Sequence, residues 1–364
     1  MMDRLRVGVI GASPNGSWGS VAHLPALTAL RQFEVTAVST AHLETAGETA
    51  KRFSVPHVFA DPRALAEHPQ VDVVAVAVRV PAHQELVSIA LGAGKHVYCE
   101  WPLARSTDEA ETLHAAAQAA GVVHMVGLQA RRSPAIEYAR DLVVAGEIGA
   151  VKAAQLTHSV PWSFGGRASS GYLLDRDSGA HFLSIPGGHS IDVLCWLLGE
   201  FSSLTATLER VGNGIDATDS VRPSHDQVTI GGMLRGGAAV GVRLQGSSRH
   251  GTGVRLEIGG TAGDLILSSV PGGRGIQMSD LTLARSTDTG RLIDLEIPAA
   301  YCDLPPAIRS NPAANVAKAY LAMHAAITAG AAPSSDFGDA VVRHRTLDAV
   351  VTSSDEGRRL VLGP

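Results

Sequence analysis

The stretch from Leu5 to Leu27 constrains the fold of this chain more than any other. It opens with the apolar run LRVGVI, which suits a strand buried on both sides, as in a parallel sheet. The run ends at Gly11 in small and turn-forming residues, and residues compatible with a helix resume at Trp18. A strand, a small-residue turn and a helix form the cradle that binds a dinucleotide pyrophosphate, because backbone N–H groups and the helix N-terminus face the phosphates.

The glycine pattern in this turn is imperfect. Gly11, Ser13 and Gly16 have the spacing of G-x-G-x-x-G, with Ser13 at the position where a small side chain lets the pyrophosphate approach. The same pattern also occurs in glycine-rich turns that bind no ligand. The order of the elements that follow decides between these interpretations.

Residues up to about 129 alternate between strand and helix patterns. We expect strands at 33–39, 57–59, 71–78, 95–99 and 122–126. Helices are expected between them, at 43–53, 62–67, 81–93 and 107–119. This alternation predicts an α/β Rossmann domain over residues 1–129 with a doubly wound parallel sheet, which is the context that a dinucleotide fingerprint requires.

After residue 130 the pattern changes to runs of strands. These are expected at 150–160, 203–211, 227–234, 238–245, 254–258 and 264–267, and helices at 133–145, 183–198, 315–329 and 337–353. Strands that follow one another without regular helices predict antiparallel pairing. We therefore expect residues 130–364 to form an α+β domain with a large, mostly antiparallel, open-faced sheet.

Composition argues against several classes of function. The chain has 364 residues, a net charge of −5 and no basic run, so nothing indicates binding to nucleic acid. No apolar segment approaches the length that spans a membrane. Cys99, Cys195 and Cys302 are far apart and match neither a disulfide framework nor metal-ligand spacing, which indicates a reducing, cytoplasmic compartment and no metal site.

Further segments carry a family resemblance. GKHVYCEWP at 94–102 resembles a GKHV-x-x-EKP segment, and GGHSIDVLCWLLG at 187–199 resembles a G-x-H-x-x-D helix. The chain is thereby similar to the glucose–fructose oxidoreductase and inositol dehydrogenase (Gfo/Idh/MocA) family. His23, the EW pair at 100–101 and LQARRSP at 128–134 narrow the resemblance to the subgroup of the yeast galactose-regulon repressor.

The resemblance implies a catalytic Lys, Asp and His, of which only the His is present. Trp101 stands where the family's dehydrogenases have the Lys, and Ile185 stands where its sugar dehydrogenases have the Asp. His189 is then the remaining general acid or base, and Asp192, one turn later on the same helix face, would orient it. The alternatives are a structural histidine at a helix terminus and a structural salt bridge of Asp192.

The segment at 172–181 is too polar and too glycine-interrupted for a core element, and it precedes the helix that carries His189. We interpret it as a substrate loop. Its candidates are Tyr172, which we group with the catalytic residues, together with Asp175 and His181. The alternative is an ordinary exposed loop.

Two other pairs of side chains are candidates for ligand contacts. Trp162 and Phe164, beside a Gly-Gly turn, could stack on a sugar ring, although aromatic residues beside loops also serve ordinary packing. Arg131 and Arg132 follow the last parallel strand, at the carboxyl edge where ligands bind. They could meet a phosphate or a substrate acid, or belong to a solvated helix start.

The cofactor expected is NAD(P). Folds that prefer NAD usually place an acid after the second strand, whereas this chain has the sequence STAH at 39–42. The missing acid removes repulsion of a 2′-phosphate without adding an arginine to bind one, which favours NADP slightly. The residues expected at the cofactor lie in the first turn, after the second strand, and in segments that resemble the family's cofactor-lining loops: Gly11, Ser13, Asn15, Gly16, Trp18, Ser39, Thr40, Val78, Arg79, Val80, His83, Glu100, Trp101, Pro102 and Gln129.

Two classes of function fit these observations. The first is an NAD(P)-dependent oxidoreductase that acts on a sugar or another small polar alcohol or carbonyl. The second, implied by the resemblance to the repressor, is a non-catalytic dinucleotide-sensing protein that acts through protein–protein contacts. A homodimer or a dimer of dimers is expected in either case. Val240, Val242 and Leu244 alternate with small or polar residues, and an uncovered apolar sheet face is typical of an interface.

Overall fold

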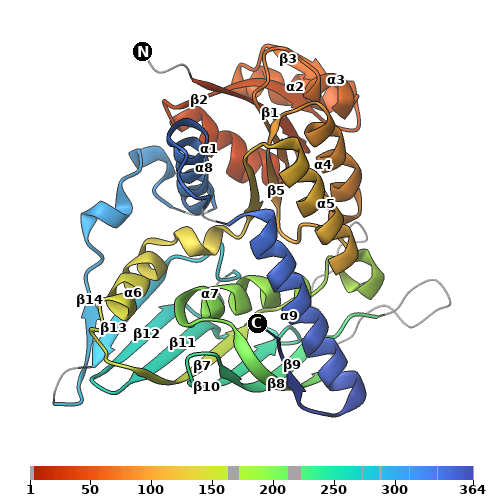
Figure 1. Ribbon diagram of the computed structural model, residues 1–364. Helices are drawn as coiled ribbons and strands as arrows, with labels where there is room; N and C mark the ends of the chain where they lie inside the picture. The colour runs from red at the N-terminus through yellow and green to blue at the C-terminus, as the bar shows by residue number, and fades with distance from the viewer. Residues whose placement is uncertain are drawn as a thin grey trace. The chain divides into compact units, whose positions relative to one another are not determined.

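The structure is a computed structural model that describes residues 4–162, 172–211, 223–272, 274–286, 289–310, 312–333 and 335–363. The chain forms two compact units (Figure 1). Unit 1 comprises Met1–Gln129 and Leu304–Val342, and unit 2 comprises Ala130–Asp303 and Arg343–Pro364. Sequence analysis assigned all residues after 129 to the second domain, but Leu304–Val342 returns to unit 1. The reason is helix α8 (Ala313–Ala329), which packs against α1 (Leu24–Ala29).

Unit 1 contains a six-stranded sheet in the order β3-β2-β1-β4-β5-β6, and every pair of neighbours is parallel. Its strands are β1 (Leu5–Ile10), β2 (Phe33–Ser39), β3 (His57–Phe59), β4 (Val73–Val76), β5 (His96–Glu100) and β6 (His124–Gly127). The predicted doubly wound parallel sheet is confirmed. Because β1 lies between β2 and β4, the strand order reverses beside β1, and ligands of such sheets bind outside the carboxyl ends at this point.

Helices connect the parallel strands of unit 1. They are α1, α2 (Leu43–Phe53), α3 (Pro62–Ala66), α4 (His83–Gly92) and α5 (Thr107–Ala120). Ser106 caps α5 by accepting a hydrogen bond from the backbone N–H of Glu109 at 3.3 Å, as its place in the sequence predicted. Gly121 ends the same helix with a φ of 63°, a conformation that glycine adopts without strain.

Unit 2 contains a nine-stranded sheet in the order β14-β13-β12-β11-β7-β10-β9-β8-β15. Its strands are β7 (Val151–Ser159), β8 (Phe201–Glu209), β9 (Gln227–Leu234), β10 (Ala239–Gln245), β11 (Gly253–Gly260), β12 (Asp264–Ser269), β13 (Leu281–Ser286), β14 (Leu292–Leu295) and β15 (Leu360–Val361). Among the neighbouring pairs of these described strands, only β7 and β10 run parallel, so the predicted mostly antiparallel sheet is confirmed.

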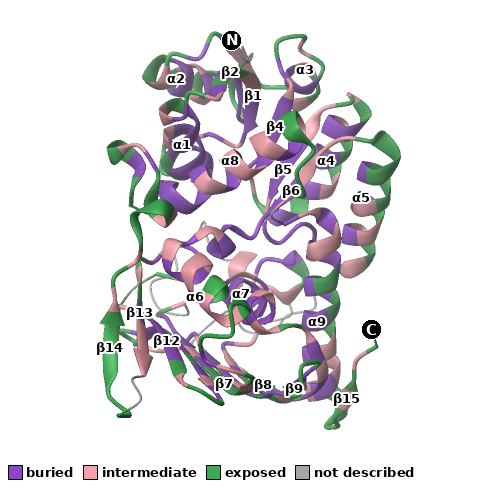
Figure 2. Ribbon diagram, turned by 60° about the vertical axis from the view of Figure 1, so that its left-hand side comes forward, coloured by how far each residue is buried: buried purple, intermediate pink, exposed green. Residues whose placement is uncertain are grey.

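Helices α6 (Pro134–Val144) and α7 (Gly188–Leu198) lie over one face of this sheet (Figure 1). Helix α7 is buried along almost its whole length (Figure 2). Helix α9 (Phe337–Glu356) begins in unit 1 and ends in unit 2, where Ser353 Oγ accepts a hydrogen bond from the backbone N–H of Ala206 on β8 at 3.0 Å. The end of α9 thus satisfies a backbone group on the outer side of β8.

The buried face of the sheet is the apolar one. Val240, Val242 and Leu244 are all buried in unit 2, and a Cβ at Gly187, just before α7, would lie 3.0 Å from the side chain of Leu244. We expected these three residues to lie on an uncovered apolar face of the sheet. This expectation was wrong, because the face on which they lie is covered. Their neighbours on β10, such as Arg243, point to the opposite face, because side chains alternate along a strand.

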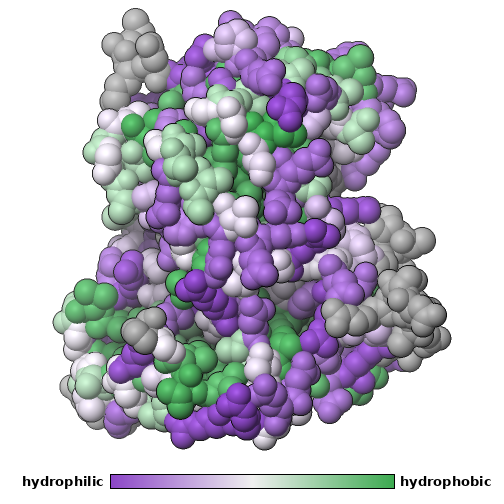
Figure 3. Space-filling model, turned by 45° about the vertical axis from the view of Figure 1, so that its right-hand side comes forward, coloured by the Kyte–Doolittle hydropathy of each residue, from purple (hydrophilic) through white to green (hydrophobic). Residues whose placement is uncertain are grey.

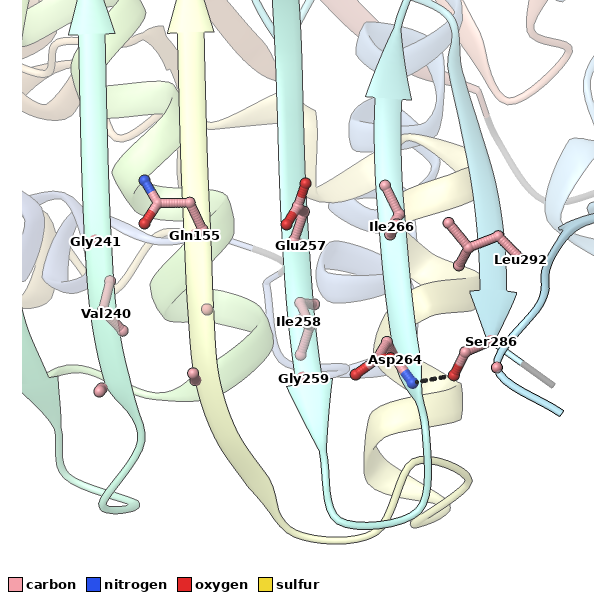
Figure 4. A pocket seen from close by; sticks show the side chains of 14 residues that line it. Gln155, Val240, Gly241, Glu257, Ile258, Gly259, Asp264, Ile266, Ser286 and Leu292 are labelled. Atoms are coloured by element: carbon pink, nitrogen blue, oxygen red, sulfur yellow. Dashed lines mark hydrogen bonds between the residues drawn. The ribbon is translucent and has the colours of Figure 1, made fainter. Parts of the chain in front are cut away.

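The opposite face of the sheet, which we call the open face, carries small and polar side chains. Gln155 lies over Gly241 of the neighbouring strand, and a Cβ at Gly241 would overlap its side chain. Gln155, Glu257 and Ile266 occupy paired positions on β7, β11 and β12, beside a shallow hollow of about 670 Å³ (Figure 4). This face therefore has a mixed rather than an apolar character.

The surface of the molecule is mixed as well. Hydrophilic side chains cover much of the face shown in Figure 3, with hydrophobic ones in small groups between them. Leu292 and Ile293 are neighbouring exposed hydrophobic residues on the edge strand β14. None of the helices within the described residues has the length and apolar character needed to cross a membrane.

Candidate functional site

The turn after β1 has the backbone geometry of a dinucleotide cradle. Gly11 has a φ of 97°, and a Cβ at this position would overlap the carbonyl oxygen of Ala77. Its N–H donates to the carbonyl oxygen of Ser39 at 2.9 Å, which fixes the turn at the carboxyl ends of β1 and β2. Only glycine fits here, because its left-handed φ and the close approach of another strand both exclude a side chain.

The glycine that packs the following helix against the strand is Gly19. A Cβ at Gly19 would lie 2.9 Å from the Cα of Ala12 and 3.0 Å from the carbonyl oxygen of Gly11. Gly16, which has the spacing of the third glycine in the fingerprint, instead has a φ of 79° and open space around its Cα. Sequence analysis missed Gly19 because the turn is three residues longer than the fingerprint assumes. Its position, just after the helical residues resume, was the available signal.

Two buried polar atoms of unit 1, one near this turn and one at the end of its first segment, have no hydrogen-bond partner among the residues that the structure describes. The indole Nε1 of Trp18 and the amide Oε1 of Gln129 are buried and make no hydrogen bond with the described residues. A buried polar atom without a partner is costly, so such atoms mark places where a ligand or water binds. Both residues are among those expected at the cofactor, and together with the Gly11 turn they fit a bound dinucleotide.

The segment after β2 carries hydroxyl groups in place of an acid. Thr40 Oγ1 donates to the carbonyl oxygen of His42 at 2.7 Å and lies 2.7 Å from Thr45 Oγ1. Ser39 and Thr40 are buried, and their backbone extends β2 beside the Gly11 turn. No carboxylate stands at this position of the sequence to repel a phosphate.

His83 joins two of the loops expected to line the cofactor. Its Nδ1 lies 2.9 Å from the carbonyl oxygen of Pro102, and its Nε2 lies 3.1 Å from that of Val78. Burial lowers the pKa of His83, so the neutral ring donates to one of these two oxygens. The ring thereby holds the segment after β4, which includes Arg79 and Val80, against the Trp101–Pro102 segment after β5, whose peptide bond is cis.

Glu100 is held by a buried hydrogen-bonded chain. His23 Nε2 lies 2.9 Å from Glu100 Oε1, and His23 Nδ1 lies 2.7 Å from the hydroxyl of Tyr320. His23 thus connects the carboxylate of Glu100 with the hydroxyl of Tyr320. Gly127 leaves room for Glu100, because a Cβ there would lie 2.8 Å from both carboxylate oxygens. Unit 1 thus positions Glu100 at the carboxyl end of β5.

In unit 2, the carboxylate of Asp192 is bound by two arginines. Arg131 donates to it from Nε at 2.8 Å and from Nη2 at 2.7 Å, and Arg343 Nε lies 3.4 Å from Oδ1. Arg343 also donates from Nη2 to Glu200 at 2.8 Å. Burial raises the pKa of Asp192, but the two guanidinium groups outweigh it and lower the pKa overall. These contacts correspond to the salt-bridge alternative for Asp192, and the side chain of Arg131 that makes them is buried.

His189 is buried on the helix that carries Asp192. Its side chain is 3% exposed, and its Nδ1 has no hydrogen-bond partner among the described residues. Burial lowers its pKa to about 3, although the Asp192 carboxylate opposes the shift. The ring is therefore neutral at pH 7.

The other residues of the expected substrate site differ in their surroundings. Tyr172 is half-buried, and Asp175 accepts a hydrogen bond from the backbone N–H of Asp177 at 3.1 Å. His181 is half-buried, and loss of solvent around its ring lowers its pKa to about 4.

The remaining candidates for ligand contacts are Trp162, Phe164 and Arg132. The Nε1 of Trp162 is buried without a partner among the described residues, and its ring lies 6.0 Å from that of Phe182. Phe164 lies outside the described residues. Arg132 Nη1 donates to Glu137 at 2.9 Å at the start of α6, which is the contact of an ordinary helix start.

Comparison with known proteins identifies both parts of the chain. Residues 5–128 match the model of the oxidoreductase family with an NAD-binding Rossmann fold, GFO_IDH_MocA. Residues 134–269 match the model of the C-terminal domain of Gal80p.

Individual relatives agree with these models. The chain is 30% identical over 295 residues to a levoglucosan dehydrogenase of Pseudarthrobacter phenanthrenivorans, which covers 73% of this chain and 74% of that protein. It is 28% identical over 297 residues to the galactose/lactose metabolism regulatory protein GAL80 of Saccharomyces cerevisiae. This match covers 74% of this chain and 67% of that protein. It is 34% identical over 212 residues to the dehydrogenase aclE of Aspergillus oryzae, but this match covers only 57% of this chain and 58% of aclE.

Solved structures show the same fold. Levoglucosan dehydrogenase in complex with NADH and levoglucosan matches with a TM-score of 0.84 at 25% identity, over 99% of this chain and 100% of that one. A super-repressor mutant of Gal80p from Saccharomyces cerevisiae matches with a TM-score of 0.83 at 24% identity, over 99% and 98% of the two chains. This chain belongs to the Gfo/Idh/MocA oxidoreductase family, in the subgroup that resembles Gal80.

Proposed function

We propose that this protein is an NAD(P)-dependent oxidoreductase that acts on a sugar or another small polar alcohol or carbonyl compound. The observation that carries the proposal is the Nδ1 of the buried His189, which has no hydrogen-bond partner in the described part of the chain, in a protein whose other unit has a turn with the geometry of a dinucleotide cradle. The similarity to a levoglucosan dehydrogenase supports a substrate rich in hydroxyl groups.

The residues that would hold the dinucleotide all belong to unit 1. The turn from Gly11 to Trp18 would bind the pyrophosphate, and Ser39 and Thr40 would face the adenosine ribose. The segments fastened by His83, together with Glu100 and Gln129, would line the rest of the molecule. When bound, the nicotinamide supplies the acceptor or donor of a hydride. The relative with bound NADH supports NAD, whereas the missing acid after β2 leaves NADP open as well.

His189 would exchange the proton that accompanies hydride transfer. Its neutral ring can accept the hydroxyl proton of an alcohol at Nδ1. In the reverse direction, the imidazolium would return this proton to the oxygen of the carbonyl compound as it receives the hydride. Trp101, at the position of the family's lysine, has no titratable group for this task. Asp192, already bound by Arg131 and Arg343, would act through its negative field, which favours the imidazolium that forms when His189 accepts a proton. Tyr172 remains a proposed contact of the substrate.

The second candidate function is a dinucleotide-sensing regulator that acts through protein contacts. Two observations favour it: the match of residues 134–269 to the Gal80p C-terminal domain, and a buried Trp101 where the resemblance implies a catalytic lysine. In either case we infer a homodimer or a dimer of dimers. The thiols of Cys99, Cys195 and Cys302 are free, which fits a reducing compartment such as the cytoplasm.

The test is a turnover assay with NAD⁺ and NADP⁺ against a panel of aldoses, anhydrosugars, cyclitols and hydroxy acids, followed by the absorbance of the reduced nicotinamide. Calorimetric titration of both nucleotides accompanies it. The enzyme predicts nucleotide binding and turnover of at least one hydroxylated compound. Nucleotide binding without turnover of any compound would favour the regulator, and absence of nucleotide binding would contradict both.

A further inference from the structure

His23 lies at the end of an unusual helical turn that directly follows the dinucleotide cradle. Gly19–His23 form a π-helical turn, η1, in which the backbone N–H of Leu24 donates to the carbonyl oxygen of Gly19. This turn runs directly into α1. Single π-helical turns are rare and occur frequently at functional sites. The position of His23 in such a turn indicates a functional role for this fully buried polar side chain.

The imidazole of His23 connects two segments that are far apart in the sequence. Glu100, the last residue of β5, lies 2.9 Å from Nε2, and the hydroxyl of Tyr320 on α8 lies 2.7 Å from Nδ1. Burial raises the pKa of the Tyr320 phenol well above its ordinary value, so the hydroxyl keeps its proton. Helix α8 belongs to the segment Leu304–Val342 that returns to unit 1. Through one imidazole, this segment therefore reaches the carboxyl end of β5.

Aromatic packing restricts the movement of this hydrogen-bonded chain. The rings of Tyr98 and Tyr320 are stacked, with centroids 4.9 Å apart and an angle of 27° between their planes. The ring of His23 stands edge-on to both, at 5.3 Å from Tyr98 and 5.7 Å from Tyr320. All three side chains are fully buried, and rings packed at the density of a protein interior have little freedom to turn. Tyr320 therefore helps to set the orientation of His23, and with it the position of the Glu100 carboxylate.

Glu100 lies on the side of the unit 1 sheet that is expected to bind the second nucleotide of the ligand. A dinucleotide binds across the point where the strand order reverses, which is beside β1. The proposed adenosine contacts, Ser39 and Thr40, follow β2, so the nicotinamide half belongs at the carboxyl ends of β4, β5 and β6. The side chain of Glu100 is 12% exposed, and a carboxylate can accept more hydrogen bonds than the one that His23 supplies.

We propose that Tyr320 is a positioning residue for the nicotinamide half of the dinucleotide. Through His23 it holds the Glu100 carboxylate, whose second oxygen accepts a hydrogen bond from an O–H or N–H group of that half. Glu100 touches the ligand, whereas Tyr320 and His23 act through Glu100. The inference rests on the nucleotide binding of the proposed function and concerns affinity rather than turnover, so it applies to an enzyme and to a regulator alike.

Three substitutions separate this role from a structural one. Tyr320→Phe removes the hydroxyl and keeps the stacked ring. Tyr98→Phe is the matched control, because it removes the other hydroxyl of the same stack, which has no hydrogen-bond partner within the described part of the chain. Glu100→Gln tests the contact itself. Its amide oxygen can keep the bond to His23, so the amide nitrogen, a donor, replaces the second acceptor oxygen.

The experiment titrates NAD⁺, ADP-ribose and ADP into the wild type and the three variants by calorimetry, with the 2′-phosphorylated series in parallel. Thermal unfolding checks that each variant folds. We expect Tyr320→Phe to weaken NAD⁺ about three- to tenfold and Glu100→Gln to weaken it at least about tenfold, with unchanged affinity for ADP. Tyr98→Phe should leave the ratio of the NAD⁺ and ADP affinities as it is in the wild type.

ADP-ribose identifies the donor, because it keeps the second ribose and lacks the nicotinamide. If Tyr320→Phe weakens ADP-ribose as it weakens NAD⁺, the donor is a ribose hydroxyl, and if it weakens NAD⁺ alone, the donor is the carboxamide.

Three results would overturn the inference: an unchanged NAD⁺ affinity in a folded Tyr320→Phe, an equal loss for NAD⁺ and ADP, as a merely structural role predicts, and a wild type that binds NAD⁺ no more tightly than ADP. The expected pattern in a protein that turns over no compound would uphold the inference while the enzymatic function fails.

Discussion

Arg131 binds both carboxylate oxygens of Asp192, from Nε at 2.8 Å and from Nη2 at 2.7 Å, with both side chains almost fully buried. Arg343 adds a third contact to the same carboxylate. Unit 2 consists of two chain segments, which begin at Ala130 and at Arg343, so Asp192 fastens the beginning of each segment to α7. This arrangement gives Asp192 a structural task in addition to its electrostatic effect on His189.

Asp192→Asn should therefore reduce stability strongly. It removes the buried negative charge that Arg131 and Arg343 share, although Arg343 keeps its contact with Glu200. Removal of one partner of a buried ion pair typically costs about 3–5 kcal/mol. Urea unfolding followed by the fluorescence of Trp196, which lies on α7, measures the change. As a control, Arg63→Ala breaks an exposed pair with Glu67 and should cost less than about 1 kcal/mol. Unchanged stability in Asp192→Asn together with a large loss of kcat would instead favour a catalytic role for Asp192.

Nucleotide binding should depend on the charge at residue 13. Ser13 lies in the turn that would face the pyrophosphate, so Ser13→Asp places a carboxylate beside another negative group. We expect affinity for NAD⁺ and NADP⁺ to fall by at least about tenfold. Ser13→Asn is the matched control, because it has nearly the same shape without the charge. Calorimetry measures both variants, and equal affinities for Asp and Asn would contradict the placement of the phosphates.

The stability of the protein should decline as the pH falls from 6.5 toward 5. Burial lowers the pKa values of His158 and His181 to about 4 and that of His189 to about 3. Below pH 6.5 the unfolded chain therefore binds protons that the folded chain does not, and stability falls by up to about 1.4 kcal/mol per pH unit for each histidine.

Urea unfolding at several pH values measures this decline. His158→Asn should remove part of the pH dependence, since the pKa values of other histidines, such as His83, are lowered as well. The carboxyl of Asp192 does not contribute to this decline. Its pKa lies below the ordinary value of 3.8 and therefore outside the range from pH 6.5 to 5. A free energy of unfolding that stays constant from pH 6.5 to 5 would show that these rings are hydrated.

Assembly should depend on the open face of the unit 2 sheet. Ala239→Arg introduces a long charged side chain at an exposed position of β10, beside the hollow in Figure 4, and should convert a dimer to a monomer. Ala119→Arg, at an exposed position of α5, is the matched control. Light scattering at micromolar concentration gives the molar mass. A monomeric wild type, or a dimer that survives Ala239→Arg, would contradict this assignment of the interface.

Local patterns predicted the elements of the chain better than its long-range contacts. The valine-rich run at 71–78 and the repeated strand–helix order indicated the parallel sheet, and β4 occupies Val73–Val76 within that run. The assignment of α8 failed because an apolar helix of 17 residues shows which residues will be buried but not against which unit. Strands β13 to β15 were missed, since short strands near a sheet edge have weak patterns.

The residues of the candidate site show the same contrast between local patterns and long-range contacts. Spacing located Gly11 and the helix of His189, whereas the partners of Asp192 lie 61 and 151 residues away and no local pattern connects them. His158 was visible in the sequence as a histidine in register with Ala154 and Leu156. Its partner Ser190 lies 32 residues away, so this contact too could be seen only in the structure.

The most direct test of the account is the turnover number of His189→Ala with the best substrate found, measured beside its nucleotide affinity. Removal of a general acid or base typically lowers the rate about 10²–10⁴-fold. The account predicts a fall of this size in kcat with nearly unchanged affinity for the nucleotide, because the residues proposed to bind it belong to unit 1 and His189 belongs to unit 2. Full activity in a folded His189→Ala would contradict the role given to His189.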